Sequence, residues 1–522
     1  MKLDRLPEYL GIVVTAIIGI LLALYLGQSA GVGSPKIYMV AAGSIALLVA
    51  LMMRENIWFL IPSLWCMIGK MVGMPGNFPL RDLVILYAFS VFLGLKALKV
   101  VRTKNQYNWL DMVLLFNLAY LLAVFIRNPV GTESMGSDRV GGKPYYEILA
   151  LVLGYWVIGH VTLTAKQAQK FPIWMTLGDI FNGVAGLLTS HIPALSFIGR
   201  FYTGIAPASA SAMGQGEGFS DEREGYLAVF GNAMGKMLFS LYSPVTCLNP
   251  VRYWRWLLLI IALISILKSG FRSELMYFGL FYAMSVYFRH GLGGLGRMAL
   301  TVVPLLCLVV FSQGRIVDYP IPVQRALSFI PGDWDYQAVE DAEGSTEWRR
   351  KLWANVWTSG HKYIDDWWFG DGFGMTRAQF NESLVSDSAE ALSICGAFHS
   401  LPLSAIRTVG YVGLCLFCVL LFCNAWHSWK LIRRTQGTPF FSIALFMGVP
   451  TITSPLPELI LTGFFDYALI NSIFSIAMMR MISRSLDKHL LEQKLASAEP
   501  ENGLPELEYR RLPCEIGPAT SL

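Results

Sequence analysis

The sequence contains few charged residues for its length. Asp, Glu, Lys and Arg make up 15% of the 522 residues, whereas soluble domains carry about 25%. Hydrophobic residues make up 54% of the chain. This balance excludes a water-soluble fold for most of the sequence and predicts helices that lie in a membrane.

Cysteine is also sparse and scattered. Of the eight cysteines, only Cys395 falls in a long polar segment between apolar runs, and the others lie in or beside apolar runs or in the polar C-terminal tail. Neither a disulfide-stapled domain nor a cysteine-rich zinc site fits this distribution. We interpret most of the cysteines as small apolar packing residues.

Recognisable cofactor motifs are missing as well. The chain has no Walker loop, no dinucleotide fingerprint and no nucleophile elbow around a serine. Its net charge of +5 is small and no basic cluster stands out, which argues against a nucleic-acid partner. The carboxylates of the polar segments do not follow a metal-ligand spacing. The sequence therefore predicts no nucleotide cofactor and no metal.

Long apolar runs are the main feature of the sequence. A membrane-spanning helix takes about 20 apolar residues, and the run at 9–27 is long enough to be one rather than the core of a signal peptide. The sequence predicts 14 such helices in all, and hence an all-α polytopic bundle. They lie near 9–27, 36–53, 55–72, 82–98, 109–126, 146–164, 173–191, 226–246, 255–270, 272–289, 297–312, 405–427, 440–461 and 464–482.

The short basic loops predict the orientation of these helices. With the N-terminus in the cytoplasm, every short basic loop falls on the same side, as the positive-inside rule requires. These loops carry Arg54, Lys99, Arg102, Lys104, Lys166, Lys170, Arg252, Arg255, Arg289, Arg297, Lys430, Arg433 and Arg434. Both termini are therefore expected in the cytoplasm, and the long polar segments on the outer side of the membrane.

This orientation divides the chain into four parts. We expect an N-terminal transmembrane bundle over 1–312, with a smaller outer loop at 192–225. A large, partly helical extracytoplasmic loop follows over 313–404, then C-terminal transmembrane helices over 405–484 and a cytoplasmic polar tail over 485–522. Tryptophan and tyrosine are frequent in the large loop, whereas disordered segments are poor in aromatic residues.

One helix can be predicted inside the large loop, over 345–360. Ser345 is a plausible N-cap and Gly360 a plausible stop. On this helix Arg349, Trp353 and Trp357 recur every four residues and therefore share a face. Such a helix could lie on the membrane surface or against the mouth of the bundle.

Several side chains could carry chemistry at the outer face. Arg272 lies between two apolar runs, where a charge is costly unless it is paired or used. Alternatively, Arg272 could have a structural role, either in an ion pair with Glu274 or in contact with lipid headgroups. Other arginines crowd the large loop, and guanidinium groups bind pyrophosphate through two hydrogen bonds at once. His399 lies where the loop returns to the membrane, and could be catalytic or structural.

Three motifs around these residues resemble the O-antigen ligase and polymerase superfamily. They are SGFRS at 269–273, the pair WRRKLWANVW and WWFGDGFGM, and FHSLPLSAIRTVGYVG at 398–413. The spacing from Arg349 to Gly360 also resembles an arginine-to-glycine motif of the polymerases. Two positions depart from the family pattern, because Ser400 follows His399 in place of Asn and the glycine turn lacks its proline.

The resemblance implies a multi-pass protein of the bacterial cytoplasmic (inner) membrane. It would be a metal-independent, GT-C-like glycosyltransferase that takes a glycan from an undecaprenyl-diphosphate donor and needs no nucleotide. Its acceptor would be a glycan, a lipid or a polysaccharide. The implied site residues would be His399 for the acceptor hydroxyl and the arginines for the diphosphate, with neighbouring side chains helping to bind donor or acceptor. The arginines are Arg272, Arg349 and Arg350, and the neighbours are Trp353, Arg407 and Arg325. An exopolysaccharide or O-antigen polymerase, and a transporter or flippase for a lipid-linked glycan, remain as alternatives.

Overall fold

The computed structural model describes residues 47–69, 78–101, 107–131, 139–192, 195, 224–386, 388–460 and 463–498. The helix predicted over 9–27 and most of the one predicted over 36–53 lie outside these residues, as does nearly all of the smaller loop at 192–225.

The described part of the chain is almost entirely helical. Up to the first long loop, its elements are η2 (Arg54–Phe59), α3 (Leu60–Ser63), α4 (Leu80–Ala97), α5 (Trp109–Arg127), β1 (Arg139–Val140), α6 (Lys143–Ile158) and α7 (Ala165–His191). After that loop come α9 (Gly225–Leu241), α10 (Pro244–Cys247), η7 (Pro250–Arg252), α11 (Tyr253–Lys268) and α12 (Arg272–Ser312). The remaining elements are α13 (Ile321–Leu327), α14 (Tyr336–Thr358), α15 (Gly360–Tyr363), β2 (Met375–Thr376), α16 (Arg377–Val385), α17 (Ser388–Ile394), α18 (Leu401–Thr435), α19 (Phe441–Thr453), α20 (Pro455–Ile460) and α21 (Phe465–Ala498).

Seven helical segments among the described residues are long and apolar enough to cross a membrane: α5, α7, η7 with α11, α12, α18, α19 with α20, and α21. The expectation of an all-helical, multi-pass membrane protein is confirmed at this level. The larger predicted number of spans, and the side of the membrane on which each loop lies, stay predictions.

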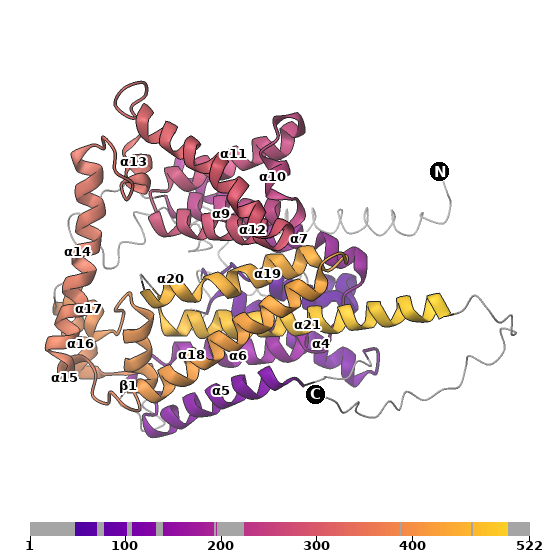
Figure 1. The fold of residues 1–522 in the computed structure, drawn as a ribbon. Coiled ribbons are helices and arrows are strands. Elements are labelled where there is room, and N and C mark those ends of the chain that lie inside the picture. Colours follow the sequence, from indigo (N-terminus) through magenta and orange to yellow (C-terminus); the bar gives the residue numbers. More distant parts are fainter. Residues whose placement is uncertain are drawn as a thin grey trace, which may run out of the picture.

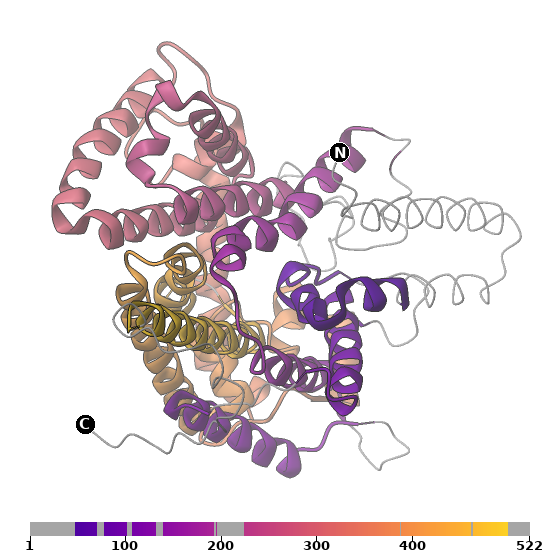
Figure 2. The same ribbon diagram turned by 90° about the vertical axis from the view of Figure 1, so that its right-hand side faces the viewer.

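The helices form two groups that lie side by side (Figures 1 and 2). One group contains α9 to α13, and the other contains α4 to α6 with α18 and α21. Helices α7 and α19 join them, because each packs against α9. The segment from α14 to α17 covers one end of the bundle, and the far end of α21 projects from the opposite end.

Some helix boundaries differ from the predicted ones. The helix predicted over 55–72 is only the 3-10 turn η2 followed by the four-residue α3, which ends at Ser63. By contrast, the separate helices predicted over 272–289 and 297–312 are confirmed as two helical stretches of α12, which meet at a kink where Gly291 has φ 64° and ψ −163°. Helix α21 runs on to Ala498, well into the predicted tail.

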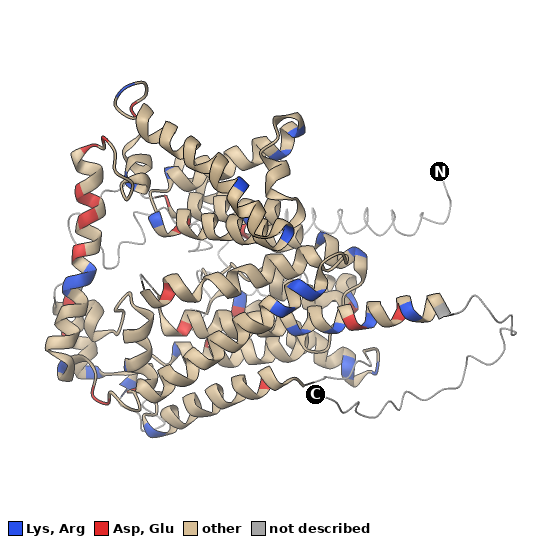
Figure 3. Ribbon diagram, in the orientation of Figure 1, with Lys and Arg blue, Asp and Glu red and all other residues tan. Residues whose placement is uncertain are grey.

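Helix α14 is longer than the predicted helix over 345–360. It begins at Tyr336, and the side chain of Asp335 caps it by accepting a hydrogen bond from the backbone N–H of Gln337. The predicted cap Ser345 is instead buried inside the helix. The predicted end is confirmed, since the helix stops at Thr358. Acidic residues line its first half and basic residues follow past its middle (Figure 3).

The glycine-rich turn after α15 docks onto a break in α18. Gly410 adopts φ 68° and ψ −177° there, so the helix opens and exposes backbone groups. The backbone N–H of Tyr411 donates to the carbonyl of Trp367 at 2.8 Å, and the N–H of Gly372 donates to the carbonyl of Thr408 at 3.0 Å. A short antiparallel pairing of β1 with β2 holds the other side of this turn. The predicted loop is thus anchored to the bundle by backbone contacts.

Candidate functional site

Two arginines meet where the start of α12 lies against α14. Arg272 is the first residue of α12, and its Nη2 donates to the carbonyl of Ala342 at 2.7 Å and to Oγ1 of Thr346 at 3.3 Å. Thr346 and Arg349 are three residues apart on α14 and therefore lie on one side of that helix. Arg272 thus fastens α14 to the bundle and stands next to Arg349.

No carboxylate in the described part of the chain balances the positive charges of these arginines. Burial lowers the pKa of Arg349, and the nearby charge of Arg272 lowers it further. Among the described residues, neither arginine forms an ion pair, and Arg349 forms no hydrogen bond either. Two half-buried cations that repel each other without a counter-ion make a site suited to an anion with more than one negative charge.

His399 completes this cluster from the segment that precedes α18. Its backbone has φ 48°, a left-handed conformation that non-glycine residues seldom adopt. Its ring lies between Trp348 on α14 and Phe464, with centroid distances of 5.5 Å and 5.0 Å. Burial lowers the pKa of the imidazole, and the charge of Arg349 lowers it further. A neutral imidazole near a cationic site can accept a proton.

Two other predicted site residues hold the backbone on which His399 lies. The indole Nε1 of Trp353 donates to the carbonyl of Phe398 at 2.8 Å. The guanidinium of Arg407 donates to the carbonyls of Cys395 at 2.9 Å and Ile394 at 3.0 Å. Both side chains point at the turn between α17 and α18. Their position fits support of His399 rather than direct contact with donor or acceptor.

The structure therefore separates the predicted residues into two sets. It brings together Arg272, Arg349 and His399. The expected binding role of Arg407 does not fit, because its guanidinium is 6% exposed and engaged with carbonyls. Arg325 on α13 is 5% exposed and is likewise out of reach of a bound molecule. Arg350 is exposed, and its charge acts on the exposed Glu347 of the same helix.

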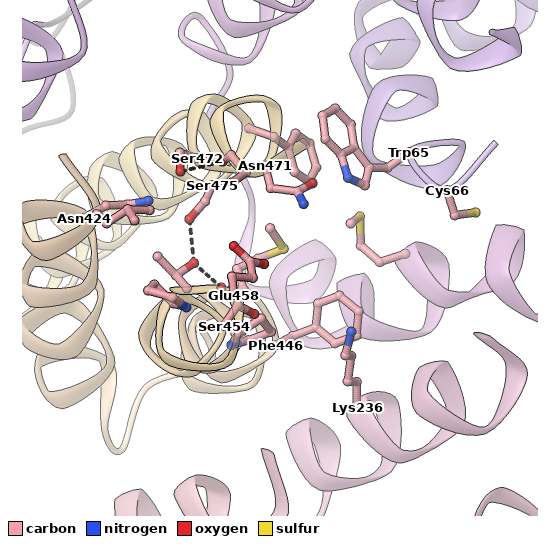
Figure 4. Close-up of a pocket in the computed structure, with 18 of the residues that line it drawn as sticks. Trp65, Cys66, Lys236, Asn424, Phe446, Ser454, Glu458, Asn471, Ser472 and Ser475 are labelled. Atoms are coloured by element: carbon pink, nitrogen blue, oxygen red, sulfur yellow. Dashed lines mark hydrogen bonds between the residues drawn. The ribbon is translucent and has the colours of Figure 1, made fainter. Parts of the chain in front are cut away.

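A cavity of about 330 Å³ lies inside the bundle, between α7 and α9 on one side and α18 to α21 on the other (Figure 4). Its wall includes the ionisable residues Asp179, Lys236 and Glu458, together with many hydroxyl and amide groups. It does not include any of the three clustered residues. The loop before α21 connects the cavity with the cluster of arginines and histidine. In this loop Phe464 contacts His399, and the preceding Gly463 packs against Glu458.

Sequence reasoning missed the ionisable residues of this cavity. Each lies within an apolar run, at 173–191, 226–246 or 440–461. An ionisable side chain inside a membrane helix is costly and marks a functional site by default. The same argument that selected Arg272 would have selected Asp179, Lys236 and Glu458 had it been applied to every predicted helix.

The described residues contain no group of three or more His, Cys, Asp and Glu side chains placed to hold a metal ion. The clustered arginines and histidine offer fixed positive charge and one proton acceptor. This set can bind a diphosphate and assist the attack of a hydroxyl group on a carbon that the diphosphate leaves.

Comparison with known proteins adds no family assignment to this geometry. No protein-family model matches the chain, and no curated protein matches it.

Proposed function

We propose that this protein is a membrane glycosyltransferase of the O-antigen ligase type. It takes a glycan from undecaprenyl diphosphate and transfers it to a glycan, lipid or polysaccharide acceptor. The observation that carries the proposal is the meeting of Arg272 and Arg349, uncompensated by any described carboxylate, with His399 beside them. The motifs that resemble the ligase and polymerase superfamily contain all three residues.

In this mechanism the acceptor hydroxyl oxygen attacks the anomeric carbon of the donor sugar. The bond from that carbon to the diphosphate oxygen breaks, and the electron pair leaves with the diphosphate. Arg272 and Arg349 stabilise the negative charge that develops there. His399 accepts the proton of the acceptor hydroxyl through its neutral imidazole. The lipid diphosphate is already activated, so the reaction draws on no nucleotide.

The proposal places the α14 end of the bundle at the outer face of the membrane. The short basic loops support this orientation through the positive-inside rule. The isoprenoid chain of the donor would then remain in the outer leaflet while its diphosphate reaches the arginines at the bundle mouth. A polymerase that extends a polysaccharide would use the same geometry with a different acceptor.

A second candidate function is transport of a lipid-linked glycan. The cavity inside the bundle favours it, because transporter binding sites lie between helix groups and carry ionisable residues. The arginine cluster favours the enzyme, because it lies at the end of α12, where the segment from α14 to α17 covers the bundle. The two candidates differ in product, since an enzyme makes a new glycosidic bond and a transporter does not.

The test is glycan transfer from a lipid-diphosphate donor to a panel of glycan and lipid acceptors, with the full chain in proteoliposomes, EDTA present and no nucleotide added. We expect transfer by the natural protein and a loss of about 10²–10⁴-fold in His399→Ala. His361→Ala is the matched control, because His361 is an exposed histidine in α15, outside the cluster, and it should transfer normally. Movement of intact donor across the bilayer without any transfer would instead establish the transport function.

A further inference from the structure

The cavity between the helix groups contains one carboxyl group, that of Glu458, that no described residue pairs. Asp179 and Glu458 line the cavity together with Lys236. The ammonium of Lys236 acts electrostatically on Asp179 and on Glu274 of α12. No cation acts on Glu458, and its carboxylate has no hydrogen-bond or ion-pair partner among the described residues. Figure 4 shows Glu458 pointing into the cavity, with Lys236 approaching from another helix.

The wall near Glu458 is built around a proline kink. Helix α19 ends at Thr453 and α20 starts at Pro455, but Ser454 between them keeps helical backbone angles, and its N–H donates to the carbonyl of Pro450 at 2.8 Å. Proline has no backbone N–H, so the carbonyls four residues before Pro450, Pro455 and Pro457 receive no helical hydrogen bond from it. Those carbonyls belong to Phe446, Thr451 and Thr453.

An independent observation comes from Asn424 on the opposite wall. Asn424 is 2% exposed, it lines the cavity, and its Oδ1 has no hydrogen-bond partner. A buried amide oxygen without a partner costs about 1–3 kcal/mol. Rotation of the amide by 180° exchanges its oxygen and nitrogen positions with little change in shape, and would present the oxygen to the cavity.

Hydroxyl groups add neutral oxygens to the wall near Glu458. Oγ1 of Thr451 and Oγ of Ser475 are hydrogen-bonded at 2.6 Å across the cavity edge, and Ser454 lies at the kink between α19 and α20 (Figure 4). Asn471 is exposed on a helix whose neighbouring residues are buried, so its amide faces the same space. At about 330 Å³ the cavity has room for a small ion with waters, since each water takes about 30 Å³.

We infer that this cavity binds a monovalent cation of the size of Na⁺, with Glu458 as its charged ligand. The single uncompensated carboxylate matches one positive charge. The neutral oxygens at the α19 to α20 kink, and waters held by Asn424, supply the rest of the coordination. A divalent ion of the Ca²⁺ type uses several carboxylates, which the described wall near Glu458 does not offer.

The inference does not rest on the proposed glycosyltransferase activity, because a cation site in the bundle would serve an enzyme or a transporter. Its test therefore uses stability rather than turnover. The probe is NaCl added to the purified full chain in lipid nanodiscs, with N-methylglucamine chloride exchanged for it to keep ionic strength constant. The readout is the thermal unfolding midpoint.

We expect a saturable rise in Tm of about 3 °C or more with NaCl, because a ligand that binds only the folded state stabilises it. Glu458→Gln should abolish the rise, and Glu458→Asp should move its half-saturation to higher NaCl. The matched control is Glu382→Gln, which removes an exposed carboxylate from α16 and should retain the full rise.

Three outcomes would overturn the inference. One is an equal Tm in NaCl and N-methylglucamine chloride. Another is a full Na⁺ response in Glu458→Gln, or in Glu458→Asp if the Gln variant does not fold. The last is a Tm that responds to pH but to no metal cation, which would make Glu458 a proton site instead.

Discussion

Arg349 lies close enough to His399 for its positive charge to lower the pKa of the imidazole, on top of the larger effect of burial. The two residues come from α14 and from the segment before α18, far apart in the sequence. Burial and the charge of Arg349 both favour the neutral imidazole, which is the form that a proton acceptor requires.

This relationship predicts a change in pH dependence. A positive neighbour disfavours protonated histidine, so Arg349→Gln should raise the pKa of His399 towards its ordinary value. Transfer is lost as pH falls through that pKa, because the base becomes protonated. The acid limb of log kcat/KM against pH should therefore lie at higher pH in Arg349→Gln than in the natural protein. An acid limb that stays in place would show that His399 is not the titrating group, or that Arg349 does not act on it.

Arg407 should matter for stability. Its guanidinium donates to the carbonyls of Ile394 and Cys395, and a hydrogen bond to a charged group contributes about 1.5–3 kcal/mol. Arg407→Met should therefore lower the Tm by several degrees. Arg349→Ala removes a cation that has no hydrogen bond and is repelled by Arg272, so it should leave the Tm unchanged or raise it. The Tm of both variants can be measured by thermal unfolding in detergent. An equal fall in Tm would contradict the assignment of Arg407 to structural support and of Arg349 to the functional site.

Gly410 should not tolerate a side chain. A Cβ on its partner Gly370 would lie 2.5 Å from the backbone nitrogen of Gly410, and a Cβ on Gly410 would meet the carbonyl of Trp368. Gly437 is the matched control, because it has a similar φ of 77° but nothing within 4 Å of an added Cβ.

We expect Gly437→Ala to lower the Tm by about 2–4 °C, through the strain of the left-handed backbone alone. Gly410→Ala should lower it at least twice as far and abolish transfer. If both variants behave alike, the close approach of Gly370 to Gly410 does not govern the docking of this turn.

Cys395 offers a direct test of orientation. It is a free, exposed thiol in the turn between α17 and α18. A membrane-impermeant maleimide should label it in intact cells, and Cys395→Ser should lose that label. Labelling that requires opening of the membrane would place the α14 end inside and invert the proposed topology.

The sequence predicted the helical membrane class well, because apolar runs report membrane burial directly. The sequence also indicated Arg272, Arg349 and His399 as candidate site residues, and the structure brings these three together. It could not separate Arg349 from Arg350, since the rotation that distinguishes adjacent side chains matters only once α14 is docked. It also overstated Arg407, because the carbonyls that this side chain satisfies lie in a turn that no sequence pattern announces.

Some predicted helix ends differ from those in the structure for similar physical reasons. The start of α14 depends on the cap at Asp335, whereas Ser345 offered an equally good local signal. By contrast, the predicted interruption between 289 and 297 is confirmed by the kink of α12 at Gly291, because a backbone with φ 64° cannot continue a right-handed helix. The cavity could not be predicted from hydropathy, because its position depends on which faces of α9, α19 and α21 meet.

The most direct test of the central claim compares Arg349→Ala with Arg350→Ala in the binding of undecaprenyl diphosphate to the purified protein. Both variants remove one arginine from the same turn of α14, and only Arg349 lies in the cluster with Arg272 and His399. A charge-assisted contact of about 1.5–3 kcal/mol corresponds to a loss of roughly tenfold or more in affinity. We predict that loss for Arg349→Ala and a change within about twofold for Arg350→Ala, where only an exposed charge is removed. Equal affinities for the two variants, or a larger loss in Arg350→Ala, would contradict the account.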